Sequence, residues 1–162
     1  MKPFHLLLII SLACLSACGF HLRGTAQIPA ALQSIALTSN DGNSDMLQEL
    51  RRALEAGDVT VLETPEASGF VLALGTESLS ERVLSVNSNA RAGEFELTMS
   101  VPFQLRNSGT VIVGPEDLSI EKVYLADPNN AVAKDEEREL MAEEMRLELV
   151  NLILRRLQSA PL

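Results

Sequence analysis

The sequence is poor in the residue types that most enzymes and metal sites require. It contains two cysteines, two histidines, one tyrosine and no tryptophan. One cysteine and one histidine lie in the first 17 residues, which we interpret as a signal peptide, so the later chain keeps only Cys18 and His21. An intrachain disulfide and an all-cysteine metal site are then excluded, and Ser–His or Cys–His catalysis has almost nothing to draw on. We predict a protein that is not an enzyme and that holds neither cofactor nor metal.

The first 17 residues follow the pattern of a secretory signal peptide. Lys2 precedes an apolar run from Leu6 to Leu15 that only Ser11 interrupts. A helix needs about 20 apolar residues to cross a bilayer, so this run is too short to span. A charged start, a short apolar middle and small residues at the end are instead typical of a signal peptide. Cleavage before Cys18 leaves 145 of the 162 residues, which predicts a single domain over 18–162.

The expected mature chain is strongly acidic. With Lys2 removed, 12 basic side chains face 22 acidic ones, a net charge of −10. General nucleic-acid binding is therefore not expected, because it depends on neutralising phosphates with lysine and arginine. No later stretch approaches the length of a spanning helix, so we do not expect the mature chain to be an integral membrane protein.

The end of the signal carries a more specific motif. Leu15-Ser16-Ala17-Cys18 resembles the lipobox of bacterial lipoproteins, in which the cysteine becomes the first residue and is acylated. Each buried methylene contributes about 0.8 kcal/mol, and two or more acyl chains anchor a protein stably. Gly19 follows where an inner-membrane retention signal would have aspartate. The resemblance implies a lipid anchor at Cys18 and sorting to the outer membrane.

Two amphipathic helices are predicted. The first runs from about Ser44 to Ala56, because Ser44 or Asp41 can cap it and its apolar residues share one face. The second begins at Asp127-Pro128, a favourable start for a helix, and runs to about Leu157. Its apolar residues form two stripes, the second made of Leu140, Leu147 and Leu154. Both stripes could pack on a sheet, or one could contact a partner protein.

The chain between these helices, together with a segment before the first, alternates as strands do. The expected strands are Ser34–Ser39, Val59–Leu62, Phe70–Thr76 with a possible continuation to Val86, Phe95–Leu105, and Thr110–Val113 continued by Asp117–Leu125. Short turns between them predict an antiparallel meander, and Pro102 indicates a sheet edge or a bulge. We predict an α+β fold of two layers, a roughly four-stranded, mostly antiparallel sheet with two helices on one face.

Several stretches together resemble the lipopolysaccharide-assembly lipoproteins of the LptE family. They are Cys18-Gly19-Phe20-His21-Leu22-Arg23-Gly24, the order helix, meander, helix, and Asp127-Pro128-Asn129-Asn130-Ala131-Val132-Ala133-Lys134-Asp135. The resemblance covers nearly all of the expected mature chain. It implies an outer-membrane lipoprotein that sits as a plug inside the β-barrel LptD, assists the assembly of that barrel, and binds lipopolysaccharide on its way to the cell surface.

The resemblance also implies two basic residues that contact lipopolysaccharide. The family's lysine matches Lys134, and Arg91 is the candidate for the family's loop arginine, although Asn87-Ser88-Asn89 stands at the expected place. Screening beyond about 8–10 Å allows a local positive cluster to act within an acidic protein. We expect Lys134 and Arg91 to project from one end of the domain and to pair with lipid phosphates. The alternative is that both are ordinary solvated side chains.

Two other functions stay open at this point. The first is an outer-membrane lipoprotein that scaffolds an envelope complex without a lipid ligand. The second is a carboxylate-based hydrolase, because Glu94 and Glu96 lie two apart on one strand face. A glycosidase pair needs a cleft and an environment that separates the two pKa values, and the sequence indicates neither.

Overall fold

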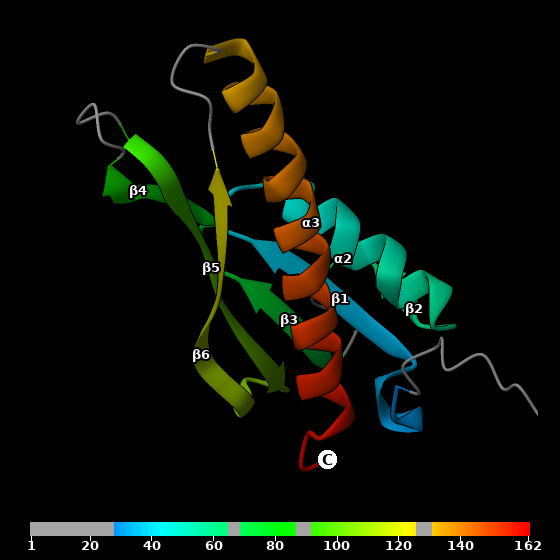
Figure 1. Ribbon diagram of the computed structural model, residues 1–162. Helices are drawn as coiled ribbons and strands as arrows, with labels where there is room; N and C mark the ends of the chain where they lie inside the picture. Colours follow the sequence, from blue (N-terminus) through cyan, green and yellow to red (C-terminus); the bar gives the residue numbers. More distant parts are fainter. Residues whose placement is uncertain (1–27, 65–68, 87–91, 126–130) are drawn as a thin grey trace, which may run out of the picture.

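The computed structural model describes residues 28–64, 69–86, 92–125 and 131–162, and it confirms a two-layer α+β fold (Figure 1). Lys134 lies within these residues, whereas the predicted lipidation site Cys18 and the predicted ligand residue Arg91 lie outside them. The elements are η1 (Ala30–Leu32), β1 (Ser34–Ser39), α2 (Asp45–Ala56), β2 (Thr60–Leu62), β3 (Phe70–Leu74), β4 (Ser78–Val86), β5 (Ala92–Asn107), β6 (Thr110–Leu125) and α3 (Ala131–Gln158).

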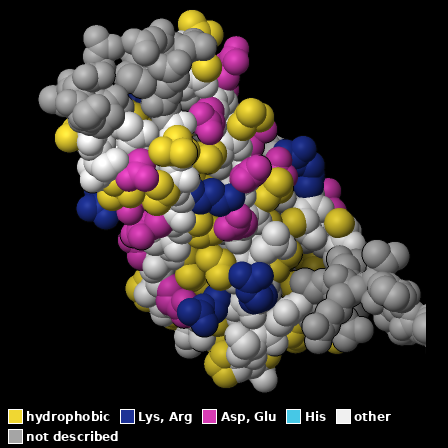
Figure 2. Space-filling model, viewed as in Figure 1, with side chains coloured by type: hydrophobic (Ala, Val, Ile, Leu, Met, Phe, Trp, Pro, Cys, Tyr) yellow, Lys and Arg dark blue, Asp and Glu magenta, His cyan; other side chains and the backbone are white. Residues whose placement is uncertain are grey.

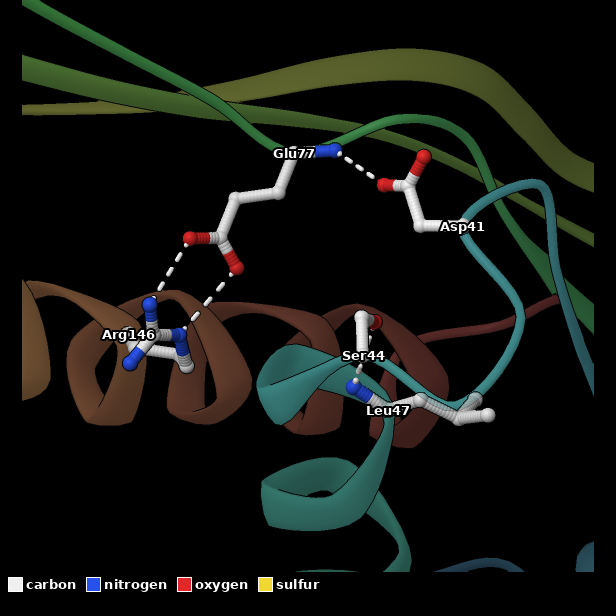
Figure 3. Close-up of polar contacts among 5 residues, drawn as sticks. All are labelled: Asp41, Ser44, Leu47, Glu77 and Arg146. Atoms are coloured by element: carbon white, nitrogen blue, oxygen red, sulfur yellow. Dashed lines mark hydrogen bonds and ion pairs between the residues drawn. The ribbon is translucent and has the colours of Figure 1, made fainter.

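Both long helices lie on the same face of the sheet, with α3 running along its length and α2 beside β1 and β2 (Figure 1). The predicted start of α2 is confirmed. The Ser44 hydroxyl accepts a hydrogen bond from the backbone N–H of Leu47 at 3.3 Å, which satisfies one of the free donors at the helix end (Figure 3). The predicted Asp127-Pro128 start of α3 lies outside the described residues.

The sheet has six strands rather than about four. Its order is β2-β1-β3-β5-β4, with β3 and β4 pairing with different parts of the long strand β5. Strand β6 also pairs with β5, along nearly its whole length. The predicted antiparallel meander holds for β4, β5 and β6. In contrast, β1 pairs in parallel with both β2 and β3. The parallel β1–β2 pair follows from the intervening helix α2, because a helical crossover returns the chain in the same direction.

One of the additional strands arises because the segment from Phe70 to Val86 is broken at Gly75 into β3 and β4. The Gly75 N–H donates to the Pro102 carbonyl at 2.7 Å, and a Cβ on Gly75 would lie 2.9 Å from the Pro102 side chain. Pro102 was expected at a sheet edge or a bulge, yet it lies on the central strand β5. Pro102 pairs with Asp117 of β6 on one side of β5. On the other side, where its carbonyl accepts from Gly75, it stands opposite the gap between the end of β3 and the start of β4, so no strand on that side requires the N–H that proline lacks. A register shift follows between Phe103 and Leu105.

One hydrophobic core fills the space between the sheet and the helices. Strand β5 contributes alternate residues, as predicted, and helix α3 contributes most of one stripe. The buried members on these two elements include Leu97, Met99, Val101, Phe103, Leu105, Met145, Leu149, Ile153 and Leu157. The second stripe of α3 divides, because Leu154 is buried whereas Leu140 is 63% and Leu147 48% exposed. Among the described helices, none combines the length and the apolar character needed to cross a bilayer.

Candidate functional site

A polar and aromatic cluster forms where the first turns of α3 approach the ends of β4, β5 and β6. The Lys134 ammonium lies 2.7 Å from Glu81 Oε1 on β4 and 3.9 Å from the centroid of the Phe95 ring on β5. The lysine therefore makes an ion pair and a cation–π contact at the same time. Its side chain is still 28% exposed, so solvent and solutes can reach it.

Glu81 is the centre of this cluster. Its Oε2 accepts a 2.7 Å hydrogen bond from the Tyr124 hydroxyl and lies 3.7 Å from Nε of Arg138. Burial favours protonation of Glu81, but the hydrogen bonds from Lys134 and Tyr124 and the charges of Lys134 and Arg138 outweigh it, and the pKa of Glu81 is lowered. The carboxylate is therefore ionised at neutral pH. Burial and the bond to ionised Glu81 raise the pKa of the Tyr124 hydroxyl, which stays a donor.

An aromatic pair forms the floor of the cluster. Phe95 and Tyr124 lie opposite each other on β5 and β6, and their rings stack with centroids 5.4 Å apart. Both residues are buried. Arg138, one turn along α3 from Lys134, is 43% exposed. This arrangement presents two cations above an apolar floor, which can pair with an anionic group attached to an apolar body.

The structure places only part of the predicted ligand site. Lys134 lies at the N-terminal end of α3, where its side chain turns toward the sheet. Sequence reasoning missed Glu81, Tyr124 and Arg138. A local signal exists for Arg138, because it follows Lys134 by four residues and shares its helix face. No local signal links Glu81 to Lys134, because 53 residues separate them.

Helix α3 also presents an apolar stripe to solvent, formed by Val132, Leu140 and Leu147. Figure 2 shows hydrophobic side chains among acidic and basic ones on the face that carries α3. Further exposed apolar side chains lie on β4 and β6, namely Val83, Leu84, Val86, Val111, Val123 and Leu125. Exposed apolar side chains along one helix, such as those of α3, are typical of a surface that another molecule covers.

The predicted alternative of a carboxylate pair at Glu94 and Glu96 finds no support in the geometry. Glu96 pairs with Arg82 of the neighbouring strand through both of its oxygens. The hydrogen bond from Arg82 lowers the pKa of Glu96, whereas a general acid needs a raised pKa. Within the described ranges, no group of three or more His, Cys, Asp or Glu side chains could hold a metal ion.

The fold and these surfaces define a class of protein: a small two-layer α+β domain with one cationic–aromatic cluster and an uncovered apolar helix face. Comparison with known proteins identifies the family. The model of the family LptE, described as lipopolysaccharide-assembly, matches residues 32–157. The LPS-assembly lipoprotein LptE of Photorhabdus laumondii is 35% identical over 160 residues, which cover 97% of this chain and 87% of that protein.

Solved structures agree with this assignment. The rare lipoprotein B of Shewanella oneidensis superposes with a TM-score of 0.70 at 31% identity, covering 78% of this chain and 94% of that one. The lipoprotein B of Nitrosomonas europaea has the same fold, with a TM-score of 0.72 at 22% identity over 87% of this chain and 91% of that one. The chain belongs to the LptE family of lipopolysaccharide-assembly lipoproteins.

Proposed function

We propose that this protein is a non-enzymatic outer-membrane lipoprotein that takes part in lipopolysaccharide assembly. Residues 1–17 are its signal peptide, Cys18 carries the lipid anchor, and residues 18–162 form one domain. The domain plugs the β-barrel LptD, helps that barrel to assemble, and binds lipopolysaccharide through Lys134 and Arg91. Membership of the LptE family supports this role, and so does the lipobox-like sequence that ends at Cys18.

The observation that carries the lipid-binding part is the position of Lys134. Its ammonium is held above the Phe95 ring with a second cation, Arg138, on the next turn of the helix. A lipid phosphate carries negative charge and several acceptor oxygens, and charge-assisted hydrogen bonds to it are stronger than neutral ones. The acyl chains or sugar of the same ligand can lie along Val83 of β4, which is exposed and pairs with Phe95 on the face of the cluster.

The uncovered stripe of α3 supports the partner-binding part. Val132, Leu140 and Leu147 are exposed on a helix whose other apolar side chains from Ala142 onward pack into the core. A barrel wall that surrounds the domain would remove these side chains from water at about 25 cal/mol per Å² of apolar surface. A scaffold without a lipid ligand would use the same stripe but would leave the cationic–aromatic cluster without a role.

Two measurements test the proposal. Purification of the full chain in mild detergent, followed by mass spectrometry, should recover a large β-barrel partner, and its absence would contradict the plug. The variant Lys134→Asp/Arg91→Asp should bind lipopolysaccharide more weakly with an unchanged circular dichroism spectrum. The single variant Lys134→Gln should show part of this loss. Lys122→Gln is the matched control, because Lys122 is also a partly buried lysine with glutamate partners and lies outside the cluster, between β6 and α3. Undiminished binding by the double variant would refute the assignment of the ligand residues.

A further inference from the structure

The carboxylate of Glu81 faces both cations of the cluster. It lies 2.7 Å from the Lys134 ammonium and 3.7 Å from Nε of Arg138. Lys134 and Arg138 are four residues apart on α3, which brings their side chains to the same side of the helix. One negative charge thus faces two positive ones, and the three side chains together keep one net positive charge.

The contacts of Glu81 are also easy to exchange. Lys134 and Arg138 are both partly exposed, and ion pairs of this kind are weak because water competes for both partners. Glu81 would not be left without a partner if the cations turned away, because the Tyr124 hydroxyl donates to its Oε2 at 2.7 Å. Tyr124 itself is buried and stacked on Phe95, so this donor stays in place.

We infer that Lys134 and Arg138 together form the phosphate-binding pair of this protein and that Glu81 is a built-in competitor, which a lipid phosphate must displace from both cations in order to bind. This inference rests on the proposed function and adds to it a second ligand residue and a means of release. A phosphate group carries more negative charge than a carboxylate and has three acceptor oxygens, so it displaces Glu81 when its local concentration is high. When the lipid moves on, Glu81 re-forms its pairs with both cations, which favours transfer over permanent retention.

The experiment compares two single substitutions that remove the same charge. Glu81→Gln removes the competitor, and it keeps an amide oxygen that can accept from Tyr124. Glu77→Gln is its control, because Glu77 also pairs with an arginine of α3, Arg146, but lies outside the cluster (Figure 3). The probes are detergent-dispersed lipopolysaccharide and the same material after removal of its phosphates. We expect Glu81→Gln to bind intact lipopolysaccharide about two- to tenfold more tightly than wild type, and Glu77→Gln to bind it as wild type does.

A second pair of variants tests the role of Arg138. Arg138→Gln should weaken binding of intact lipopolysaccharide by about two- to tenfold. Arg156→Gln should not, because Arg156 pairs with Glu116 near the other end of the same helix. Removal of the phosphates should abolish the differences among all four variants and wild type.

The outcomes separate this inference from the proposed function. If wild type does not bind lipopolysaccharide, or if Lys134→Gln binds as wild type does, the proposed function fails and this inference with it. If Lys134→Gln weakens binding but Glu81→Gln binds no more tightly than Glu77→Gln, competition by Glu81 is refuted while the lipid-binding role of Lys134 stands. If Arg138→Gln binds like Arg156→Gln, Arg138 is not part of the pair.

Discussion

The Tyr124 hydroxyl donates a 2.7 Å hydrogen bond to Glu81 across two strands that do not pair with each other. Tyr124 lies on β6 and Glu81 on β4, and the central strand β5 separates them. The bond passes over the helix-covered face of the sheet beside Phe95, which stacks on the tyrosine ring. It therefore joins the two outer strands directly under the first turns of α3.

The ionised form of Glu81 should stabilise the folded protein in a pH-dependent way. Because the folded state lowers the pKa of Glu81, the carboxylate contributes fully above its ordinary value of 4.5, and this contribution is lost as the pH falls through the lower folded value. The melting temperature of wild type should exceed that of Glu81→Gln at pH 7, and the difference should shrink below about pH 4.5. Thermal unfolding of wild type and Glu81→Gln at about pH 7 and about pH 3 measures this difference in melting temperature. A difference at the lower pH as large as that at the higher one would contradict the stabilising role.

The exposed stripe of α3 should matter for the partner and not for the fold. Leu140→Ser/Leu147→Ser should change the free energy of unfolding by about 0.5 kcal/mol or less, because both side chains already face water. The same variant should recover less of the barrel partner on purification. Leu149→Ala is the contrasting change, since Leu149 is fully buried, and it should cost about 2–5 kcal/mol in urea denaturation. Full recovery of the partner by the double variant would place the interface elsewhere.

The features that the sequence predicted correctly depend on neighbouring residues. The cap at Ser44 and the alternation from Phe95 to Leu105 are local patterns, and both are found in the structure. The existence of two helices and their common face also follow from their apolar periodicity. Lys134 was identified by resemblance, and its position at the end of α3 is consistent with its proposed role.

The features that the sequence did not predict depend on contacts between distant segments. Glu81 and Lys134 form an ion pair although they are 53 positions apart in the sequence. The break at Gly75 lies where Pro102 of another strand approaches it. The stripe of Leu140, Leu147 and Leu154 has one period, yet Leu154 is buried and the first two are exposed. Periodicity predicts which residues share a face, but the extent of the opposing surface decides which of them are buried.

The ion pair between Glu77 and Arg146 should hold α3 against the start of β4. Two hydrogen bonds of 2.9 and 3.1 Å join the two side chains, which are 18% and 15% exposed (Figure 3). The Glu77 N–H also donates to Asp41 at 2.9 Å, which fixes the backbone that carries it. Arg146→Met should lower the free energy of unfolding by about 1–3 kcal/mol in urea denaturation, because it leaves a partly buried carboxylate without its partner. Arg52→Met, in an exposed pair with Glu49 on α2, should cost about 0.5 kcal/mol or less, and equal losses would contradict the argument from burial.

Gly114 should not tolerate any side chain. Comparison with Gly109 separates the effect of close packing from the effect of backbone conformation. Gly114 and Gly109 both have positive φ angles, +81° and +87°, which side chains disfavour. A Cβ on Gly114 would lie 2.7 Å from the Phe103 carbonyl oxygen and 2.8 Å from the Glu116 nitrogen, whereas a Cβ on Gly109 would meet nothing within 4 Å. Gly109→Ala should therefore cost about 1 kcal/mol from its backbone conformation alone. Gly114→Ala should cost more than about 2 kcal/mol, because backbone atoms of β5 and β6 must also move apart. Urea denaturation of both variants measures the difference, and equal costs would show that the close approach of β5 to Gly114 adds nothing beyond the backbone conformation.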